Sequence, residues 1–440
     1  MRRFTYIFIL FAVLAPKAQA SDAAAPDSTF RKVGFSFGVL PAIAYDNDLG
    51  FQYGLLSNLY WYGDGTEYPR YNHSLYLECS RYAAGTMLAR AYFDSRTFIP
   101  KTRFTADLTW FDDLTLDFTG FNGAESVYRR EFIDEDDPLY RTRIFYKHQR
   151  QMTRLMVSLR RKFNDDSPFF WQAGATAFNM KIRKVNPDRL RGSFPDEPTL
   201  FEHYTDWGVI RPKEVDGGFE TYLRGGICVD TRDNEAFPTK GVWTEALMAY
   251  APEFLSSDKN GYGKLTVYHR QYFDLYKQRL VFAYRVALQH KLWGRTPFYL
   301  LPHWNTTVLT SATSQGLGGS KTMRGVVRNR IVGDGSFMGN AELRYIFARF
   351  MLDGQSFSIG TNVFADFGMV TQKYDIDTSN VPSEVYADYF SRKNEKMHVS
   401  SGIGLKIALN TNFVVSIDWG HALDKNDGKS GLYVLMNYLF

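Results

Sequence analysis

The sequence predicts an all-β protein, a transmembrane antiparallel β-barrel, and three observations carry that prediction. Apolar and polar residues alternate in segment after segment, aromatic residues make up 16% of the chain, and no apolar stretch after residue 20 is long enough to cross a bilayer as a helix. Strands whose side chains face lipid and lumen in turn have this period of two and a polar average composition. A soluble β-sandwich also alternates, but here the charges fall repeatedly on one face of the strands, which favours the barrel.

The end of the chain is the clearest strand. Leu432, Val434, Met436, Tyr438 and Phe440 share one face, which is entirely apolar. Successive side chains of a strand point to opposite sides, so this face is expected to meet lipid.

Two earlier segments place acidic residues on the lumen side. Glu342 alternates with apolar Leu343, and Asp366 alternates with apolar Phe367. Both carboxylates are therefore expected to point into the barrel.

Sixteen strands can be placed along the chain. They lie near residues 50–62, 71–83, 86–98, 102–111, 114–128, 141–163, 167–181, 219–233, 241–254, 263–275, 279–292, 337–349, 358–370, 398–409, 411–420 and 431–440. An even number returns both ends of the barrel to the periplasmic side, so the long connections 182–218, 293–336 and 371–397 are expected on the outer side. The short turns 83–86, 164–167, 276–278 and 410–412 are expected on the other side.

The N-terminus predicts export. Residues 1–20 have the charged, apolar and small-residue regions of a signal peptide, with cleavage expected after Ala20. Residues 21–49 then form a short periplasmic segment, and residues 50–440 form the barrel domain. Removal of the leader takes away three of the 52 Lys and Arg residues and no acid, so the formal net charge falls from +5 to +2. Bulk charge therefore gives no support to nucleic-acid binding.

The stretch GGSKTMRGVVRNR, residues 318–330, combines glycines, hydroxyls and four cations. A phosphate-binding loop is disfavoured because Ser320 replaces the glycine before Lys-Thr and no helix pattern follows. Lys321, Arg328 and Arg330 are expected to be solvated or paired with wall carboxylates, and an anion or lipopolysaccharide contact is the alternative.

Other chemistry has little support. A barrel-embedded hydrolase would need a Ser-His pair, for which His290 and His303 are available, but no nucleophile motif accompanies them. Asp230, Asp233 and Asp418 are expected to form hydrogen bonds in the lumen rather than a metal site, and no cofactor is predicted. Strand parity turns Cys79 to lipid and Cys228 to the lumen, so no disulfide is expected.

Four stretches together resemble the BamA/TamA family of outer-membrane proteins, over essentially the whole mature chain. They are GICVDTRDNEAFPTKG at 226–241, GGSKTMRGV at 318–326, the Phe-x-Asp-x-Gly motif at 364–368, and the terminal strand ending in Phe440. The resemblance implies a sixteen-stranded barrel with a long loop folded into the lumen, and Phe440 as part of an assembly signal. The chain departs from the family at Val326, where Phe or Tyr is usual.

The resemblance also implies a site. The loop arginine of the family pairs with acids on the inner wall, and the matching residues are Arg324, Gly325, Glu342 and Asp366. An Arg forked onto a carboxylate makes directional, charge-assisted hydrogen bonds that fix a loop in place, and Gly325 permits close backbone approach or a positive φ.

By the same resemblance, the chain is expected in the bacterial outer membrane, assisting the insertion or translocation of outer-membrane proteins and not acting as an enzyme. Only about 30 residues separate Ala20 from the first expected strand, so a POTRA domain is not expected. A separate periplasmic partner is expected instead. Lipids, lipopolysaccharide and client proteins are the other expected partners. The alternative is a transport pore or surface-binding barrel gated by the lumenal loop.

Overall fold

The computed structural model describes residues 32–440 except 67, 69, 191, 236, 310–315, 353–354, 410–412 and 437, and the side chain of residue 413. The predicted signal peptide, residues 1–20, and the first part of the segment 21–49 lie outside the described residues. No helix in the described ranges is long and apolar enough to cross a membrane.

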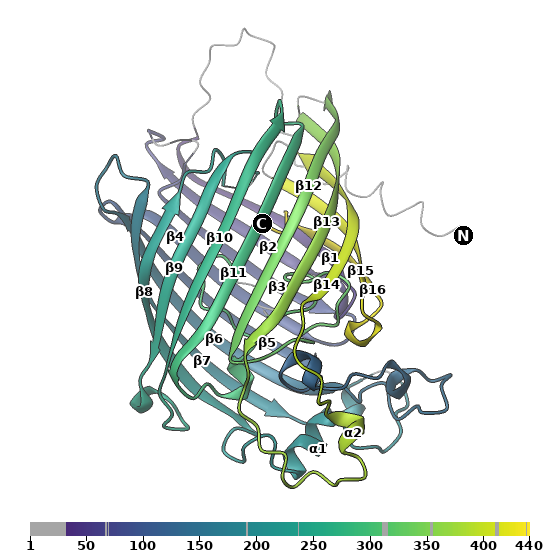
Figure 1. Ribbon diagram of the computed structural model, residues 1–440. Helices are drawn as coiled ribbons and strands as arrows, with labels where there is room; N and C mark the ends of the chain where they lie inside the picture. Colours follow the sequence, from purple (N-terminus) through teal and green to yellow (C-terminus); the bar gives the residue numbers. More distant parts are fainter. Residues whose placement is uncertain are drawn as a thin grey trace.

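Sixteen strands form one closed antiparallel barrel in which each strand pairs with its neighbours in sequence and β1 pairs with β16 (Figure 1). The strands are β1 (Gly34–Asp46), β2 (Gly50–Gly63), β3 (His73–Tyr82), β4 (Met87–Ile99), β5 (Thr102–Asp117), β6 (Lys147–Lys162), β7 (Phe169–Arg183), β8 (Gly217–Asp230), β9 (Gly241–Ala251), β10 (Tyr262–Tyr276), β11 (Leu280–Gly294), β12 (Gly335–Leu352), β13 (Gln355–Gln372), β14 (His398–Leu409), β15 (Phe413–Ala422) and β16 (Ser430–Met436). The predicted fold class and strand number are confirmed.

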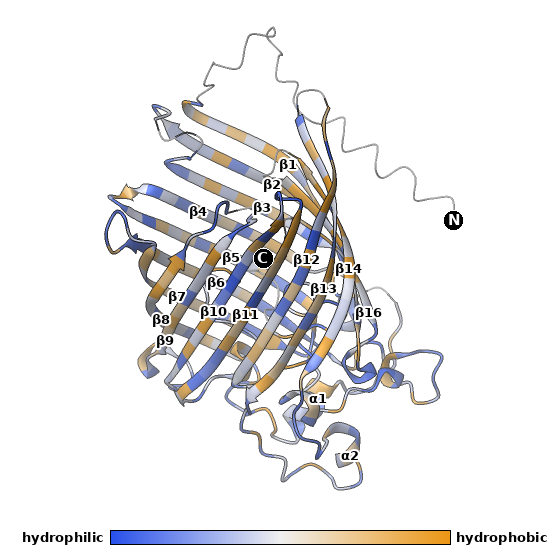
Figure 2. Ribbon diagram, turned by 45° about the horizontal axis from the view of Figure 1, so that its top comes forward, coloured by the Kyte–Doolittle hydropathy of each residue, from blue (hydrophilic) through white to orange (hydrophobic). Residues whose placement is uncertain are grey.

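Inward and outward faces alternate along the strands, as the bands of contrasting hydropathy in Figure 2 show. Leu343 is 40% exposed and Val363 51%, whereas Glu342 is 1% exposed and Asp366 is fully buried. The predicted faces of these residues are correct, because apolar side chains surround the barrel and polar ones fill it.

The longest connections meet at one end of the barrel, here called the long-loop end. Residues 184–216, 295–334 and 373–397 lie there, as predicted, together with 118–146 and the short helices α1 (Leu200–Asp206) and α2 (Tyr386–Tyr389). Residues 83–86 also belong to this end, so their predicted place at the opposite end is wrong. Strand direction decides this, because 83–86 join β3 to β4, an odd strand to the next even one.

Two strand predictions are wrong. Residues 114–128 are not a separate strand: β5 continues to Asp117, and the chain then turns at Asn122, whose φ is 64°. The sixteenth strand is instead β1 at Gly34–Asp46, so the barrel begins at residue 34 rather than 50. The rings of Phe118 and Phe121 pack against each other at 5.4 Å in the long-loop end, although Leu114, Leu116 and Phe118 alternate with polar residues in the sequence as they would in a strand.

Aromatic side chains hold the long connections together. Phe121 lies 6.1 Å from Tyr204, 6.3 Å from Phe298 and 4.9 Å from Tyr374, measured between ring centroids. These four rings come from four different connections. They build a hydrophobic core at the long-loop end, separate from the lipid-facing surface.

The contact between β1 and β16, here called the seam, is much shorter than the others. Only Tyr45 with Val434 and Asp46 with Tyr433 pair across it among the described residues, whereas β1 pairs with β2 along its whole length, including Pro41 with Leu55. The β16-side edge of β1 before residue 45 therefore has no strand partner in the described part of the chain.

Candidate functional site

The stretch 318–330 lies in the connection between β11 and β12, and its glycines shape it. Gly318 and Gly319 have φ values of 114° and 86°, which L side chains rarely adopt. Within this turn the Thr322 hydroxyl donates to the Gly316 carbonyl at 2.8 Å. Inward-facing side chains bind its backbone: Arg285 donates to Lys321 O at 2.6 Å and Asn340 to Thr322 O at 2.7 Å.

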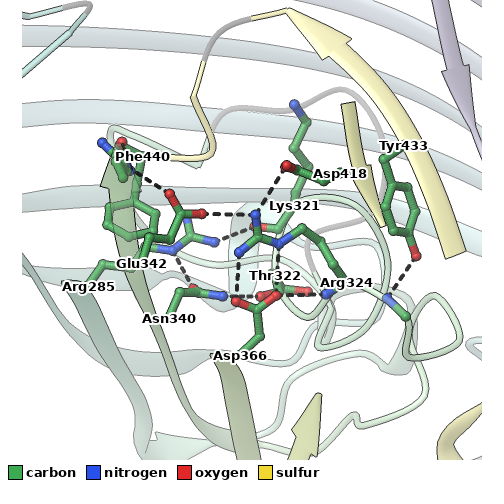
Figure 3. A network of polar contacts seen from close by, with 12 residues as sticks. Arg285, Lys321, Thr322, Arg324, Asn340, Glu342, Asp366, Asp418, Tyr433 and Phe440 are labelled. Carbon is green, nitrogen blue, oxygen red and sulfur yellow. Dashed lines mark hydrogen bonds and ion pairs between the residues drawn. The ribbon is translucent and has the colours of Figure 1, made fainter. Parts of the chain in front are cut away.

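Arg324 projects from this turn onto the Asp366 carboxylate (Figure 3). Its Nε and Nη2 donate to the two Asp366 oxygens at 2.9 Å each, and its backbone N–H donates to the same carboxylate at 3.0 Å. Arg324 and Asp366 are both fully buried. The third donor fixes the backbone of the loop as well as its side chain.

Two further carboxylates complete the surroundings of Arg324. Its Nη1 lies 2.9 Å from Glu342 Oε1 and 3.0 Å from Asp418 Oδ2. Its guanidinium carbon stands 3.4 Å from the ring centroid of Phe364, a cation–π contact. Strands β12, β13 and β15 thus converge on one loop residue, and the group of Arg324, Gly325, Glu342, Asp366 and Asp418 is called the Arg324 site below.

The charges of the Arg324 site are balanced. Arg344 donates to Glu342 at 2.8 Å, and Lys406 donates to Asp418 at 2.6 Å. Three carboxylates therefore face three cations. Breaking such a buried network from one side costs about 3–5 kcal/mol, because the remaining partners stay buried without compensation.

Gly325 brings the loop backbone against the wall. Its φ is 91°, and a Cβ there would lie 2.5 Å from the Gly420 carbonyl carbon. Its N–H donates to the Tyr433 hydroxyl at 3.1 Å. Because Tyr433 is also one of the two β16 residues paired with β1, this hydrogen bond connects the loop to the seam.

The last residue of the sequence lies close to the same network. Phe440 is 5% exposed, and its main-chain oxygen accepts a hydrogen bond from Arg344 at 2.9 Å. Its ring packs with Tyr272, Val281 and Ala283. Phe440 therefore belongs to the interior of the folded barrel, and its predicted place on a lipid-facing strand is wrong, because β16 ends at Met436. Its role as an assembly signal stays a prediction.

The two remaining arginines of the stretch are paired rather than solvated. Arg328 Nη1 lies 3.0 Å from Asp113 Oδ2, and its Nε lies 2.9 Å from Asp117 Oδ2, both on β5. Arg330 donates to Gly123 O and to the Ser126 hydroxyl at 3.0 Å. The connection is thus held on two sides of the barrel.

The structure brings together all four residues of the predicted loop site and adds partners that the sequence analysis did not assign to it. Asp418 was expected only to form hydrogen bonds in the lumen, Phe364 was named only as part of the Phe-x-Asp-x-Gly motif, and Tyr433 was not assigned to the site. Inward parity was the available signal for Asp418. Val326, at the expected aromatic position, is buried in a cluster with Met323 and other apolar residues, and the aromatic contact to Arg324 comes from Phe364 instead.

The other candidates do not assemble into a site. His290 is exposed on the outward face, while His303 is buried in the connection after β11. Cys79 is exposed and Cys228 is buried, and both are free thiols, so the parity prediction for them is correct. Within the described ranges, no three His, Cys, Asp or Glu residues are grouped to hold a metal ion.

Comparison with known proteins gives the same fold. The BamA of Haemophilus ducreyi lacking POTRA domains 1–3 superposes with a TM-score of 0.54 at 15% identity, over 92% of this chain and 70% of that one. CdiB of Escherichia coli gives a TM-score of 0.53 at 11% identity, over 92% of this chain and 63% of that one, so the chain spans less than two thirds of CdiB. A search of curated proteins finds no significant match. The family model for the Omp85 superfamily domain matches residues 72–436, and the chain therefore belongs to the Omp85 superfamily.

Proposed function

We propose that this chain is an outer-membrane barrel that inserts or translocates outer-membrane or surface proteins, and that Arg324, Gly325, Glu342 and Asp366 hold the connection that keeps its seam in place. Membership of the Omp85 superfamily and the fold shared with BamA and CdiB support the general role. We further propose that a separate periplasmic protein delivers the clients to the barrel. Outer-membrane lipids and lipopolysaccharide would surround the barrel.

The short seam is the observation that carries the proposal. Among the described residues, two pairs join β1 to β16, whereas the ladder between β12 and β13 runs from Gly335 to Leu352. A strand edge without a partner exposes a row of N–H and C=O groups on which another strand can pair. The edge of β1 supplies such a row beside exposed Phe35, Phe37 and Val39.

The Arg324 site is placed to control this edge. Tyr433 pairs with Asp46 across the seam and accepts the Gly325 N–H. Asp418, on the neighbouring strand β15, binds Arg324. Movement of β16 away from β1 would therefore strain the loop attachment, and release of Arg324 would free both strands.

A reversible cross-link tests the proposal directly. Tyr45→Cys with Val434→Cys, made in a Cys79→Ser background, places two thiols directly opposite each other on the seam. Antiparallel partners stand at Cα distances that a disulfide spans. The matched control is Leu343→Cys with Val363→Cys, an outward-facing pair within the continuous β12–β13 ladder.

The readout is the outer-membrane proteome after depletion of the wild-type chain. The oxidised seam pair should fail to restore a subset of outer-membrane proteins, and a reductant should restore them, while the control pair should behave as wild type throughout. Full complementation by the oxidised seam pair would refute the insertion proposal. An unchanged proteome on depletion, with loop-dependent conductance in planar bilayers, would establish the alternative of a transport pore or surface-binding barrel.

A further inference from the structure

A second buried guanidinium, that of Arg150 on β6, has an environment unlike that of Arg324. Arg150 is 1% exposed, and none of its Nε, Nη1 and Nη2 atoms donates to a described protein group. Buried donors are almost always satisfied, and buried charges are almost always paired. Arg150 therefore calls for a counter-group that the described part of the chain does not supply.

The nearest carboxylates are already engaged. Asp113 stands opposite Arg150 in the β5–β6 register, but its Oδ2 binds Arg328 at 3.0 Å. Asp117 binds Arg328 at 2.9 Å and also pairs with Lys147. Both carboxylates are thus bound to other cations, and none of the described side chains forms a hydrogen bond with the Arg150 guanidinium.

Polar atoms without a partner accumulate around Arg150. His148, two residues earlier on the same face of β6, has a buried Nδ1 with no described hydrogen-bond partner, and its ring stacks on Phe201 at 5.2 Å. Both ring nitrogens of His303 are likewise buried without one. Burial first, and then the charge of Arg150, lower the pKa of His303 well below its usual value, so His303 adds no second charge.

A small cavity adjoins these groups. Its volume is about 30 Å³, and Arg150, His148, Asp117, Tyr299 and Asn329 are among the residues that line it. A cavity of this size accommodates one or two water molecules or a monoatomic ion. It is too small for a phosphate group, and the Asp117 carboxylate in its lining would repel a dianion.

We propose that Arg150 and His148 form a binding site for a small monovalent anion of the size of chloride, enclosed between β6 and the connection 295–334. The guanidinium supplies charge and three donors, and the His148 ring supplies a further N–H in the tautomer protonated at Nδ1. Asp117 is neutralised by Lys147 and Arg328, so it does not cancel the attraction. The anion gives Arg150 the hydrogen-bond partner that no described side chain gives it.

The proposed anion site also affects how the connection 295–334 is attached to the barrel wall. Asn329 lines the cavity and directly follows Arg328, which binds β5. A bound anion would thus stabilise the part of the connection that lies beside β5, independently of Arg324. Loosening this part of the connection would open the cavity and release the ion.

Bromide is the probe for the test, because it replaces chloride and scatters anomalously. Crystals of the full chain grown in bromide should show an anomalous peak beside Arg150, and the peak should be lost in Arg150→Met. Arg160→Met is the matched control, because Arg160 lies on the same strand, is partly exposed and stacks on Phe170 instead. It should keep the peak.

A solution measurement covers the case in which a variant does not crystallise. At constant ionic strength, replacing gluconate by bromide should raise the Tm of the wild type and of Arg160→Met saturably, by about 2 °C. Arg150→Met should show no such rise, and Arg150→Lys should show a smaller one. Equal Tm values for the wild type in both salts, or a bromide peak that persists in Arg150→Met, would overturn the proposal.

Discussion

Arg324 and Arg150 are both arginines buried inside the same barrel, but within the described part of the chain only Arg324 is paired. Arg324 meets three carboxylates from three strands, while Arg150 donates to no described protein group. Arg324 reaches its partners from a loop, which can adjust its position. Arg150 is fixed on a strand, opposite an aspartate that Arg328 already occupies. The role of a buried charged side chain therefore depends on its counter-charge and not on burial alone.

The largest effect is expected from Arg324→Ala. Three buried carboxylates would lose their shared partner, which should lower the free energy of unfolding by about 3–5 kcal/mol. Urea unfolding followed by tryptophan fluorescence in detergent measures this change, and planar-bilayer recording should show raised or unstable conductance. Arg160→Ala serves as the control. Wild-type stability and conductance in Arg324→Ala would mean that the three carboxylates do not depend on the loop.

Gly325→Ala keeps every charge of the Arg324 site but disturbs the backbone that presents them. A Cβ at φ 91° meets the Gly420 main chain, so we expect a loss of about 1–3 kcal/mol in the free energy of unfolding. The same unfolding assay applies. Gly38→Ala on β1, where a Cβ would contact nothing within 4 Å, should be nearly silent. A silent Gly325→Ala would show that the loop can move without losing Arg324.

Glu395, in the connection before β14, is a carboxylate whose hydrogen bonds are expected to make the stability of the protein depend on pH. It accepts hydrogen bonds from the backbone N–H groups of Ala124 and Val370 at 2.7 and 2.9 Å. Burial raises its pKa, but His398 and these two N–H groups outweigh burial and lower it below the ordinary 4.5. The folded state thus gains stability from ionised Glu395 above pH 4.5 and loses it as the pH falls through the lowered pKa.

Glu395→Gln should therefore reduce stability by about 1 kcal/mol at neutral pH and reduce the loss of stability that occurs as the pH falls below 4.5. Unfolding midpoints across this range measure both. Glu384→Gln, in the same connection, is the control. An unchanged pH profile in Glu395→Gln would place the acid sensitivity on another carboxylate.

The smallest effect is expected from Arg150→Met in gluconate. Replacing a buried charge that lacks a protein partner by an apolar side chain of similar length is often neutral or stabilising. Its free energy of unfolding should lie within about 1 kcal/mol of wild type, in contrast to Arg324→Met, which should be strongly destabilised. Equal losses for the two substitutions would remove the distinction between the two arginines.

Much of the architecture was predictable because it depends on alternation. The faces of Glu342 and Asp366 follow from a period of two, and so do most strand positions. The segment 114–128 was misassigned because Leu114, Leu116 and Phe118 alternate with polar residues as in a strand, whereas Phe118 packs among the loops. The strand β1 was missed because Gly34, Gly38 and Pro41 weaken its strand pattern.

The sites were less predictable because their residues come from strands and loops that are distant in sequence and meet only in the folded barrel. Resemblance located Arg324 and its two acids, but parity alone did not reveal that Asp418 would join them from β15. Arg150 reads in sequence as one more inward cation, between His148 and Met152. Nothing in the sequence tells that Arg328, far along the chain, takes the carboxylate opposite it.

Pro41 has a consequence for whatever pairs with the edge of β1. Proline offers no N–H, and within sheets it is confined to positions where that donor is not needed. A strand added along Gly34–Ala44 could form a continuous ladder only on either side of residue 41. The edge is thus divided into two short stretches on which a guest strand could pair. Such an interrupted hydrogen-bond ladder would favour reversible pairing of a guest strand, and it would discourage a second barrel from joining edge to edge.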